Sequence, residues 1–400
     1  MSYRLIGLAM LGTIFQWFDF SLFSYYTPIF AKSFFQQDNP TTAILNTLLV
    51  FAMSYLLSPL GSVLFGYIGD QKGRKTALVT SILCMAIPTF LIGLLPTYSY
   101  IGILAPIALM MIRVVQGLVA SAEYSQSAIY LIEHSPPKNC AMMGTLTSSS
   151  YCIGVVLAGI TATFAPHWRW GFIVAGMFGF FFYVLRRTLP ETPVFSALSP
   201  TQKSKPPFLE VMKKSPKAFF RGVMIGAWVG VYSFLTHVFM ISYLTTQSKL
   251  PLKWVAGIVT MGMVVDGICQ PIFAKIADTW GHEKMLRVGQ ILMLICIYPL
   301  VQAVMSGQQS LIVFGIMGLA FLMAISFSTI NLYLVNLFPP EYRSSGFNIS
   351  FHVGVSLFGA TAPYVVYKVV HLTQMKMFVA IYLLLFTLIG CLATSRGEST

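Results

Sequence analysis

Charged residues are scarce in this chain. Asp, Glu, Lys and Arg together make up 9% of its 400 residues, and only 12 residues are acidic, whereas 56% are hydrophobic. A soluble globular domain usually carries about 25% charged residues, which help to cover its surface. The shortage of charge, together with a mean hydropathy of +0.76, excludes a soluble globule and predicts an integral membrane protein.

Paired cysteines and enzyme motifs are also missing. The six cysteines have no paired spacing, which argues against a disulfide framework or a thiolate metal site. No G-x-S-x-G, H-E-x-x-H or G-x-x-x-x-G-K-[ST] motif is present; GHEKML has His282 and Glu283 but lacks a second His. We therefore expect no enzyme, no metal or cofactor and no ATP-driven step in this chain. A repeated pore element of an ion channel is not visible either.

Apolar runs of about 20 residues, long enough to cross the hydrocarbon core of a bilayer, fill most of the chain. Twelve spans are predicted, and the fold class is therefore all-α integral membrane. The first span is too long for a cleavable signal peptide and is expected to remain as a helix. The predicted spans are 5–31, 42–68, 76–95, 100–132, 141–165, 169–187, 218–245, 253–275, 287–306, 309–337, 345–367 and 373–394.

Basic residues give the chain a net charge of +13, but they lie between the apolar runs, so no nucleic-acid partner is expected. If the N-terminus is cytoplasmic, eighteen of the 25 Lys and Arg residues fall on the inner connections and six on the outer ones. The positive-inside rule then predicts that both termini are cytoplasmic. The expected location is the inner membrane of a bacterium, with multiple passes through the lipid bilayer.

The longest polar connection, residues 188–217, is rich in Pro, Ser and Lys. It is predicted to be a cytoplasmic linker between an N-terminal six-helix bundle (1–187) and a C-terminal six-helix bundle (218–400). This connection divides the chain into two groups of six spans.

A short motif recurs in the two predicted bundles. GYIGDQKGRK follows the second span and AKIADTWGHEK follows the eighth. Asp70 and Asp278 are 208 positions apart, as are Gly73 and Gly281, which implies an internal duplication. The glycines permit a tight turn, and each aspartate can accept hydrogen bonds from a facing helix N-terminus or pair with an arginine. We expect these contacts to latch the bundles together on the cytoplasmic side.

At this motif the chain resembles the major facilitator superfamily, whose loop between spans two and three carries G-x-x-x-D-x-x-G-R-[RK]. More narrowly, it is similar to the metabolite:proton symporters, the branch with the proline/betaine, α-ketoglutarate, citrate and shikimate carriers. The resemblance implies two pseudo-symmetric six-helix bundles, alternating access and proton-coupled transport. The further matching stretches are QWFDF (16–20), SPLGSVLFGYIGD (58–70), LLPTYSYIGILAPIAL (94–109), RVVQGLVASAEYS (113–125), LPETPVF (189–195) and LFPPEYRSSGFN (337–348). The candidate residues of the cytoplasmic gate are Gly66, Asp70, Gly73, Arg74, Asp278, Gly281 and Arg343.

The chain departs from this branch at two positions of similar depth in the membrane. The branch usually has Glu where Gln16 stands and Arg where Ser58 stands. We hypothesise that the relatives hold an ion pair here and that this chain has lost it as a unit, because keeping one partner would strand a charge.

Four ionisable residues are predicted well inside spans: Asp19, Arg113, Glu123 and Asp266. Each costs about 3 kcal/mol or more at the bilayer centre, so each should be paired, solvated or functional. Arg113 keeps its proton and has to meet an anion, which can be Asp19, Glu123 or a substrate carboxylate. One interpretation is a permanent ion pair that holds helices together. The other is a carboxylate that alternates between a proton and a cation; Asp19, Glu123 and Asp266 are the candidates for this proton coupling.

Several other polar and aromatic residues within spans are candidates for substrate contact. Arg113, Gln116 and Glu123 share one broad face of the fourth span, which we expect to look into a central cavity. Trp228 and Tyr232 share a face of the seventh span, while His237 fits that face only marginally. Helix packing is the alternative role for the aromatic residues, and an interhelical hydrogen bond is the alternative for His237. The predicted substrate-binding residues are Arg113, Gln16, Gln116, Tyr26, Trp228, Tyr232, His237 and Asn331.

The sequence thus predicts a secondary active transporter for a small carboxylate-bearing metabolite, either an organic anion or a zwitterion. Arg113 suits a carboxylate, and the aromatic residues of the first span suit a quaternary ammonium group. Proton symport is expected; a proton-driven exporter, an uncoupled facilitator and a non-transporting sensor on the same scaffold are the alternatives. The expected partners are the small-molecule substrate, protons and the lipid bilayer, and the chain is expected to act as a monomer.

Overall fold

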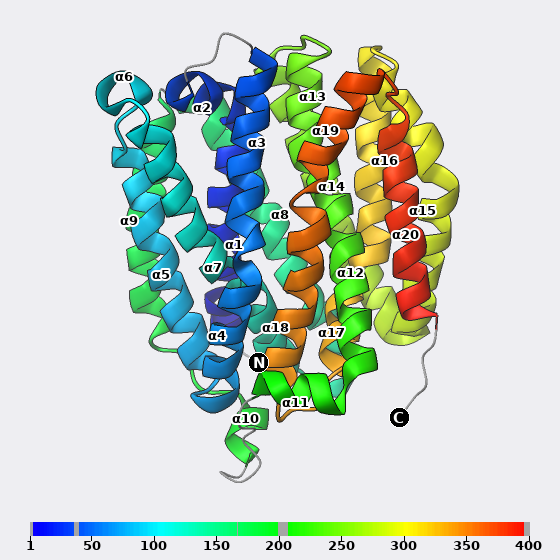
Figure 1. The fold of residues 1–400 in the computed structure, drawn as a ribbon. Helices are drawn as coiled ribbons and strands as arrows, with labels where there is room; N and C mark the ends of the chain where they lie inside the picture. The colour runs from blue at the N-terminus through cyan, green and yellow to red at the C-terminus, as the bar shows by residue number, and fades with distance from the viewer. Residues whose placement is uncertain (1–2, 36–39, 166, 199–206, 396–400) are drawn as a thin grey trace.

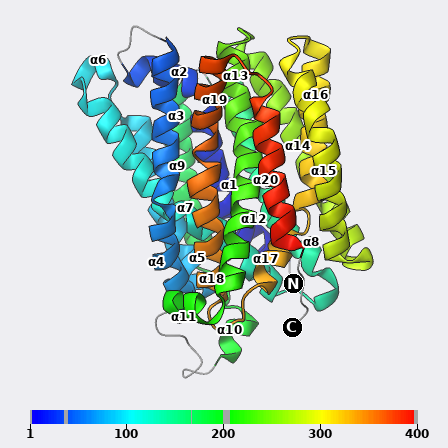
Figure 2. The same cartoon turned by 45° about the vertical axis from the view of Figure 1, so that its right-hand side comes forward.

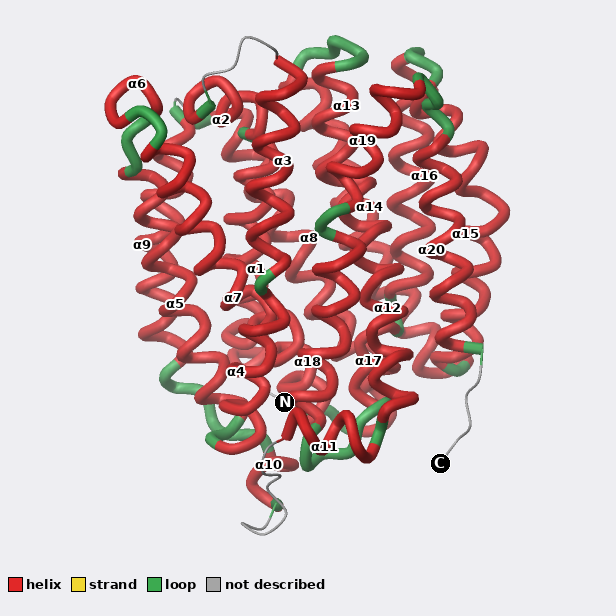
Figure 3. The backbone as a smooth tube through the Cα atoms, viewed as in Figure 1, coloured by secondary structure: helices red, strands yellow, loops and turns green. Residues whose placement is uncertain are grey.

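The computed structural model describes residues 3–35, 40–165, 167–198 and 207–395, and helices account for most of these residues. No strand occurs within these ranges. Figure 3 shows the result: long helical tubes run the height of the molecule and the loops gather at its two ends. The predicted all-α class is confirmed.

We call residues 3–186 the first half and residues 216–394 the second half. The first half contains α1 (Tyr3–Tyr25), α2 (Thr27–Phe34), α3 (Pro40–Leu56), α4 (Ser58–Gln71), α5 (Arg74–Leu94), α6 (Tyr98–Ile101), α7 (Leu104–Glu133), the 3₁₀ turn η1 (Pro137–Asn139), α8 (Cys140–Phe164) and α9 (Trp168–Arg186). The connection contains α10 (Pro193–Ala197) and α11 (Pro207–Lys214). The second half contains α12 (Pro216–Phe234), the π turn η2 (Leu235–Phe239), α13 (Met240–Thr246), α14 (Leu252–Trp280), α15 (His282–Met305), α16 (Gln309–Phe327), α17 (Ile330–Asn336), α18 (Arg343–Gly354), the π turn η3 (Val355–Gly359), α19 (Ala362–Thr373) and α20 (Phe378–Thr394).

Twelve helical segments match the twelve predicted spans. Eleven of them have at least 18 residues and enough apolar character to cross a membrane, and α20 is the shorter twelfth. Large apolar side chains such as Leu60, Phe164 and Phe181 are exposed on the outside, where lipid chains can cover them. The chain is therefore an integral membrane protein with twelve transmembrane helices.

Four spans are interrupted: the second, the seventh, the tenth between α16 and α17, and the eleventh at the π turn η3. The second span consists of α3 and α4, which meet at Leu57 just before Pro59, a residue that has no N–H to donate to the preceding turn. The seventh span contains the π turn η2 between α12 and α13. Such interruptions are tolerated where neighbouring helices cover the freed backbone groups.

At the repeated Asp-x-x-Gly motif the turn between two helices is shorter than the predicted spans suggested. α14 runs to Trp280 and α15 starts at His282, so the turn between them is Gly281 alone. Gly281 has φ +107° and Gly73 has φ +104°, a backbone conformation that glycine adopts without steric cost. The glycines thus allow helices to meet almost without a loop.

The two halves stand side by side. In Figure 1 most helices of the first half lie on the left and most of those of the second half on the right. The turn of 45° in Figure 2 brings α12, α18, α19 and α20 of the second half to the front. Both labelled termini, α10 and α11 lie at the bottom of the view, which we call the linker end. The division into bundles at 1–187 and 218–400 stays a prediction, and part of the predicted linker, 199–206, lies outside the described residues.

The halves meet mainly along two helix pairs, α8 with α14 and α4 with α18. Within the first half, α4 and α7 approach closely because glycine lacks a side chain: a Cβ on Gly61 would lie 1.6 Å from the carbonyl oxygen of Leu118. Small residues at such contacts are typical of membrane helices, where close packing replaces the hydrophobic effect as the driving force.

Candidate functional site

A small cavity of about 50 Å³ lies between the two halves. Most of the lining side chains are aromatic or uncharged polar, and none of the described lining residues is Asp, Glu, Lys or Arg. The first half contributes Gln16, Trp17, Tyr55, Tyr124, Ser148 and Tyr151, and the second half contributes Val229, Gly230, Ser233, Phe234, Gln270, Met323, Phe327, Phe351, His352 and Val355. Of the predicted substrate-binding residues, Gln16 lines this cavity.

Aromatic rings form the cavity wall in pairs. Trp17 meets Tyr151 edge-on with ring centroids 4.4 Å apart, and Tyr124 stacks across the halves on Phe351 at 5.7 Å. The indole N–H of Trp17 is buried and has no partner among the described residues. Ring faces attract cations, and an unpaired indole N–H can donate to an anion. The cavity thus offers both kinds of contact without a fixed charge.

Asp19 and Arg113 form a buried ion pair in the first half, beside this cavity rather than on its wall. Arg113 Nη1 lies 2.7 Å from Asp19 Oδ2, and both side chains are almost fully buried. Gln116 bridges the pair: it donates to Asp19 Oδ1 at 3.0 Å and accepts from Arg113 at 3.0 Å. The guanidinium also lies 4.0 Å from the ring centroid of Phe23. Of the three anions that the sequence left open for Arg113, the structure has Asp19.

Glu123 has a cation of its own, Arg186. Arg186 Nη1 donates to both carboxylate oxygens, at 2.9 and 2.8 Å, and Ser81 donates to Oε1 at 2.6 Å. The remaining nitrogens of Arg186 donate to the carbonyl oxygens of Leu8 and Ala9. Sequence reasoning placed Arg186 on a loop as a topological charge. It is in fact fully buried at the last residue of α9.

Asp266 differs from the other two carboxylates. It is fully buried on α14, yet it has no Lys, Arg or His within 4 Å among the described residues. Its hydrogen-bond donors are neutral: Gln270 Nε2 at 2.9 and 2.8 Å from the two oxygens, and Cys152 Sγ from α8 at 2.9 Å. Gln270 also lines the cavity. Asp266 is therefore one hydrogen bond away from the cavity wall.

The remaining predicted substrate residues are buried and lie off the described cavity wall. Trp228 and Tyr232 share a face, as the spacing predicts, but that face packs on Phe327, and the Tyr232 hydroxyl donates to the Leu319 carbonyl at 2.8 Å. Tyr26 lies between α1 and α2, at the N-cap position of α2.

Two further predicted residues lie at contacts between the halves. His237 sits edge-on to Tyr25 at 5.5 Å. Asn331 on α17 donates to the carbonyl oxygen of Gly144 on α8 at 3.0 Å.

Ser58, one of the departures from the resembling branch, also bridges the halves. Its hydroxyl lies 2.7 Å from that of Ser356. The side-chain amide oxygen of Gln16, Oε1, is buried and has no hydrogen-bond partner among the described residues. A lost ion pair between positions 16 and 58 stays a hypothesis.

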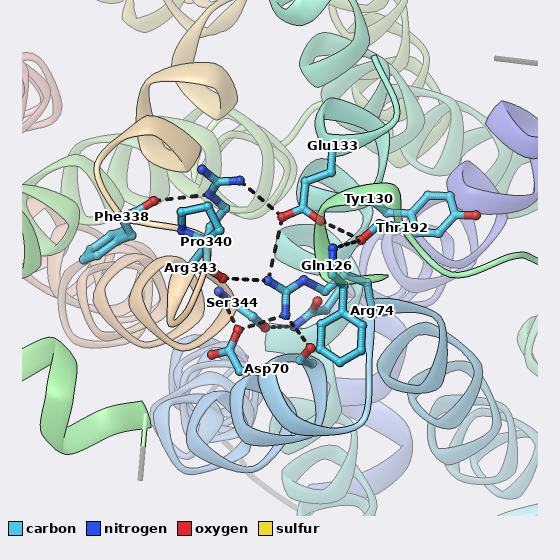
Figure 4. Close-up of polar contacts among 12 residues, drawn as sticks. Asp70, Arg74, Gln126, Tyr130, Glu133, Thr192, Phe338, Pro340, Arg343 and Ser344 are labelled. Carbon is cyan, nitrogen blue, oxygen red and sulfur yellow. Dashed lines mark hydrogen bonds and ion pairs between the residues drawn. The ribbon is translucent and has the colours of Figure 1, made fainter. Parts of the chain in front are cut away.

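At the linker end, the two repeated aspartates make equivalent contacts between the halves (Figure 4 shows the first). Asp70 accepts from the amides of Ser344 and Ser345 in the first turn of α18, at 3.2 and 2.9 Å. Asp278 accepts from the amides of Ala141 and Met142 in the first turn of α8, at 2.9 and 3.0 Å. Each carboxylate thus caps the positive end of a helix in the other half, as the repeat predicted.

Arginines reinforce the first of these caps (Figure 4). Arg74 pairs with Asp70 at 2.9 Å and donates to the carbonyl oxygen of Pro340 at 3.1 Å. Arg343 pairs with Glu133 of α7 at 3.2 Å, and Glu133 also accepts from Thr192 of the connection at 2.7 Å. The predicted gate residues Asp70, Arg74 and Arg343 therefore lie in one cluster that joins both halves and the connection. Gly66 packs against α18, where a Cβ would lie 2.9 Å from Ser345 Cα.

The opposite end also has a contact between halves. The Tyr25 hydroxyl of α1 lies 2.8 Å from Thr260 Oγ1 of α14. Contacts between the halves are therefore present towards both ends of the cavity.

The sequence pattern of the Major Facilitator Superfamily matches residues 9–363. The chain belongs to this superfamily. It is 30% identical to an inner membrane metabolite transport protein of Escherichia coli K12, covering 90% of this chain and 86% of that protein. It is 28% identical to a glycine betaine/proline/ectoine/pipecolic acid transporter of Dickeya dadantii, covering 97% of this chain and 82% of that protein.

Solved structures share the fold of this superfamily member. The proton:xylose symporter XylE superposes with a TM-score of 0.75 at 14% sequence identity, covering 98% of this chain and 94% of that one. The superfamily and the named relatives are transporters, so the chain is a membrane transporter and not an enzyme.

Sequence reasoning missed several residues of this transporter's site. Arg186 was counted among the basic residues of the inner connections, and Glu133 was not considered; their partners lie 63 and 210 residues away. Gln270 and Cys152 are single polar residues in apolar helices. Gln270 follows Asp266 by four positions, so the i, i+4 spacing could have identified it as a partner.

Proposed function

We propose that this transporter moves a small zwitterion that carries a substituted ammonium group and a carboxylate, by alternating access and together with a proton. The observation that carries the proposal is the cavity between the halves, whose wall is aromatic and uncharged. A net-neutral substrate needs no fixed counter-charge there. Its cationic group suits the faces of Trp17, Tyr124 and Phe351, and its carboxylate suits the unpaired indole N–H.

The names of the relatives support this substrate class. Glycine betaine, proline, ectoine and pipecolic acid, which appear in the name of the Dickeya dadantii transporter, are zwitterions with a carboxylate. An organic anion remains the alternative substrate, but the two arginines that could neutralise it, Arg113 and Arg186, are engaged by Asp19 and Glu123.

Among the three candidate proton carriers, the geometry favours Asp266. Asp19 and Glu123 each have an arginine at 2.7 to 2.8 Å, and this pairing gives the carboxylate a structural role. Asp266 has only neutral donors and lies next to the cavity through Gln270. Buried ionisable groups without a permanent partner are typical of proton pathways.

We propose that the helix caps of Asp70 and Asp278 form the gate at the linker end and that this end faces the cytoplasm. Opening there requires both caps to leave the first turns of α18 and α8. The contact between Tyr25 and Thr260 would open in the other phase of the cycle.

The proposal is tested with purified protein in liposomes. Labelled glycine betaine should exchange in a counterflow assay, and an inward proton gradient should drive its accumulation. Trp17→Ala should weaken glycine betaine binding about 5- to 30-fold, because a desolvated cation–π contact is worth about 1–2 kcal/mol.

Trp170→Ala, at a tryptophan exposed on the outer surface, is the matched control and should leave binding unchanged. Absence of exchange with any zwitterion or organic anion would contradict the transport proposal. Exchange without an effect of the proton gradient would instead indicate an uncoupled facilitator.

A further inference from the structure

Gln270 connects Asp266 to the cavity in one particular orientation. Its amide nitrogen donates to both carboxylate oxygens of Asp266, at 2.9 and 2.8 Å. Its carbonyl oxygen is buried and has no hydrogen-bond partner among the described residues, and Gln270 is part of the cavity wall. The side-chain amide of Gln270 therefore donates to Asp266, and its oxygen accepts no hydrogen bond from a described residue.

Asp266 is also held at the contact between the halves. The Cys152 thiol of α8 donates to Oδ2 at 2.9 Å, and Gly267 makes room for it, because a Cβ there would lie 2.9 Å from Cys152 Cβ. The titratable groups that interact with Asp266 are Tyr124 of α7, Tyr151 and Cys152 of α8, Tyr232 of α12 and Cys269 of α14. Of the other helices packed on α14, α16 has no titratable residue, α13 carries Tyr243, and α15 carries Cys296 and Tyr298, with its charged residues confined to 282–287. The turn η1, which also packs on α14, carries Lys138, and α14 itself carries Lys253, Lys275 and Asp278. No described Lys, Arg or His lies within 4 Å of Asp266, and its side-chain hydrogen-bond donors, Gln270 and Cys152, are uncharged.

The hydrogen bonds available to this pair depend on one proton. An ionised carboxylate only accepts hydrogen bonds, whereas a protonated carboxyl group also donates one. With Asp266 ionised, the arrangement of the structure is the favourable one: the Gln270 amide N–H groups face the carboxylate. With Asp266 protonated, its O–H can donate to the Gln270 carbonyl oxygen, and a half-turn of the amide then frees the N–H groups.

We propose that Gln270 converts the protonation of Asp266 into affinity for the substrate carboxylate by turning its amide group. This inference rests on the proposed function. When Asp266 is ionised, the cavity meets the carbonyl oxygen of Gln270, which repels a carboxylate. When Asp266 has taken a proton from water entering the cavity, the cavity meets the amide N–H groups, which bind a carboxylate.

The sign of this coupling is that of a symporter. Protonation of Asp266 raises the affinity for the substrate, and by linkage the bound substrate raises the affinity of Asp266 for its proton. When the cavity opens to the other side and the substrate leaves, the amide returns to the carboxylate and the proton passes to water. The Cys152 thiol stays hydrogen-bonded to Oδ2 of Asp266 throughout the cycle. Gln270 is then the residue of the pair whose orientation toward the cavity changes with the protonation of Asp266.

The test compares two ligands on the purified full-length protein at acidic and at alkaline pH, with binding followed by titration calorimetry. Glycine betaine carries a trimethylammonium group and a carboxylate; choline carries the trimethylammonium group without the carboxylate. In the native protein, glycine betaine should bind at least about tenfold more tightly at acidic pH, the worth of a hydrogen bond to a charged group. Choline should bind equally at both values.

Gln270→Met keeps the length of the side chain and removes its donors, and it should reduce glycine betaine binding at acidic pH to the alkaline level. Asp266→Asn imitates the protonated state, because its amide can donate to the Gln270 carbonyl oxygen, and it should bind glycine betaine tightly at both pH values. Gln290→Met is the matched control at a buried glutamine of α15, whose amide nitrogen has no partner among the described residues; it should keep the native pH dependence.

A native pH dependence in Gln270→Met, or the same pH dependence for choline, would overturn the role of Gln270 while leaving the transport proposal intact. Proton-driven accumulation by Asp266→Asn would instead refute Asp266 as the proton carrier. Glycine betaine that fails to bind the native protein at any pH would overturn both.

Discussion

Replacing Glu123 with glutamine should destabilise the fold instead of uncoupling transport. Glu123 is the acceptor for Arg186 Nη1 at 2.8 to 2.9 Å and for Ser81 at 2.6 Å, and both charged side chains are almost fully buried. In Glu123→Gln the guanidinium keeps its backbone carbonyl acceptors but loses its counter-charge. Breaking a buried pair in this way costs about 3–5 kcal/mol, and since glutamine keeps one acceptor oxygen we expect a loss of about 3 kcal/mol.

The assay is thermal or denaturant unfolding of the purified protein in detergent, with transport measured in parallel. Glu123→Gln should unfold at a clearly lower temperature, while the folded fraction should retain proton-driven uptake. Adding Arg186→Met should recover part of the loss, because the stranded charge is removed. Glu283→Gln is the matched control: its partner Arg287 is 3.6 Å away and both side chains are about half exposed, so the effect should stay within about 0.5 kcal/mol.

Two results would refute this reasoning. An unchanged unfolding temperature of Glu123→Gln would mean that the pair contributes no net stability. A variant with native stability that exchanges substrate but no longer responds to a proton gradient would identify Glu123 as a proton carrier, the role that the sequence left open for it.

Three further predictions concern packing and gating. Gly12→Ala would place a Cβ 2.0 Å from a carboxylate oxygen of Glu123 and should lower the free energy of unfolding by about 1–3 kcal/mol in unfolding assays. The control Gly7→Ala, which has nothing within 4 Å of the added Cβ, should leave the stability unchanged. Asp278→Ala removes a helix cap worth about 1 kcal/mol and should raise maleimide labelling of Cys140, in the adjoining turn, about fivefold; unchanged labelling would argue against a gate there. Thr260→Val removes the hydroxyl bonded to α1 at 2.8 Å and should shift spin-label distances across that end towards longer values.

The fold and the helix caps at the linker end could be predicted because they rest on local patterns. Apolar runs predict the spans. The Asp-x-x-Gly motif, which recurs at Asp70 and Asp278, predicts two turns at one end of the molecule whose aspartates cap facing helices. Helix caps need only a carboxylate at a helix end and a facing N-terminus, so the motif contains most of the information. The polar connection at 188–217 and the resemblance to a known family both predicted the two-bundle arrangement, which the spans alone do not specify.

The partners of the buried charges could not be predicted in the same way. Arg186 ends α9, where a basic residue is equally typical of a membrane boundary, and its contact with Glu123 depends on how α7 and α9 pack. The shared face of Trp228 and Tyr232 was correct, but periodicity cannot tell whether a face looks into a cavity or onto Phe327 of a neighbouring helix. Tertiary packing decides both questions.

The placement of charge separates a zwitterion from an organic anion by a measurable quantity. With Asp19 and Glu123 neutralised by arginines, the proposed cycle carries the substrate and one proton on Asp266. A zwitterion then moves one net positive charge, and a membrane potential of 100 mV contributes about 2.3 kcal/mol, or about 50-fold accumulation without any proton gradient. A monovalent anion with one proton moves no net charge and gains nothing. A potassium diffusion potential imposed on liposomes with valinomycin measures the difference: accumulation driven by the potential alone supports the zwitterion, and its absence in a vesicle that responds to a pH gradient would favour the anion.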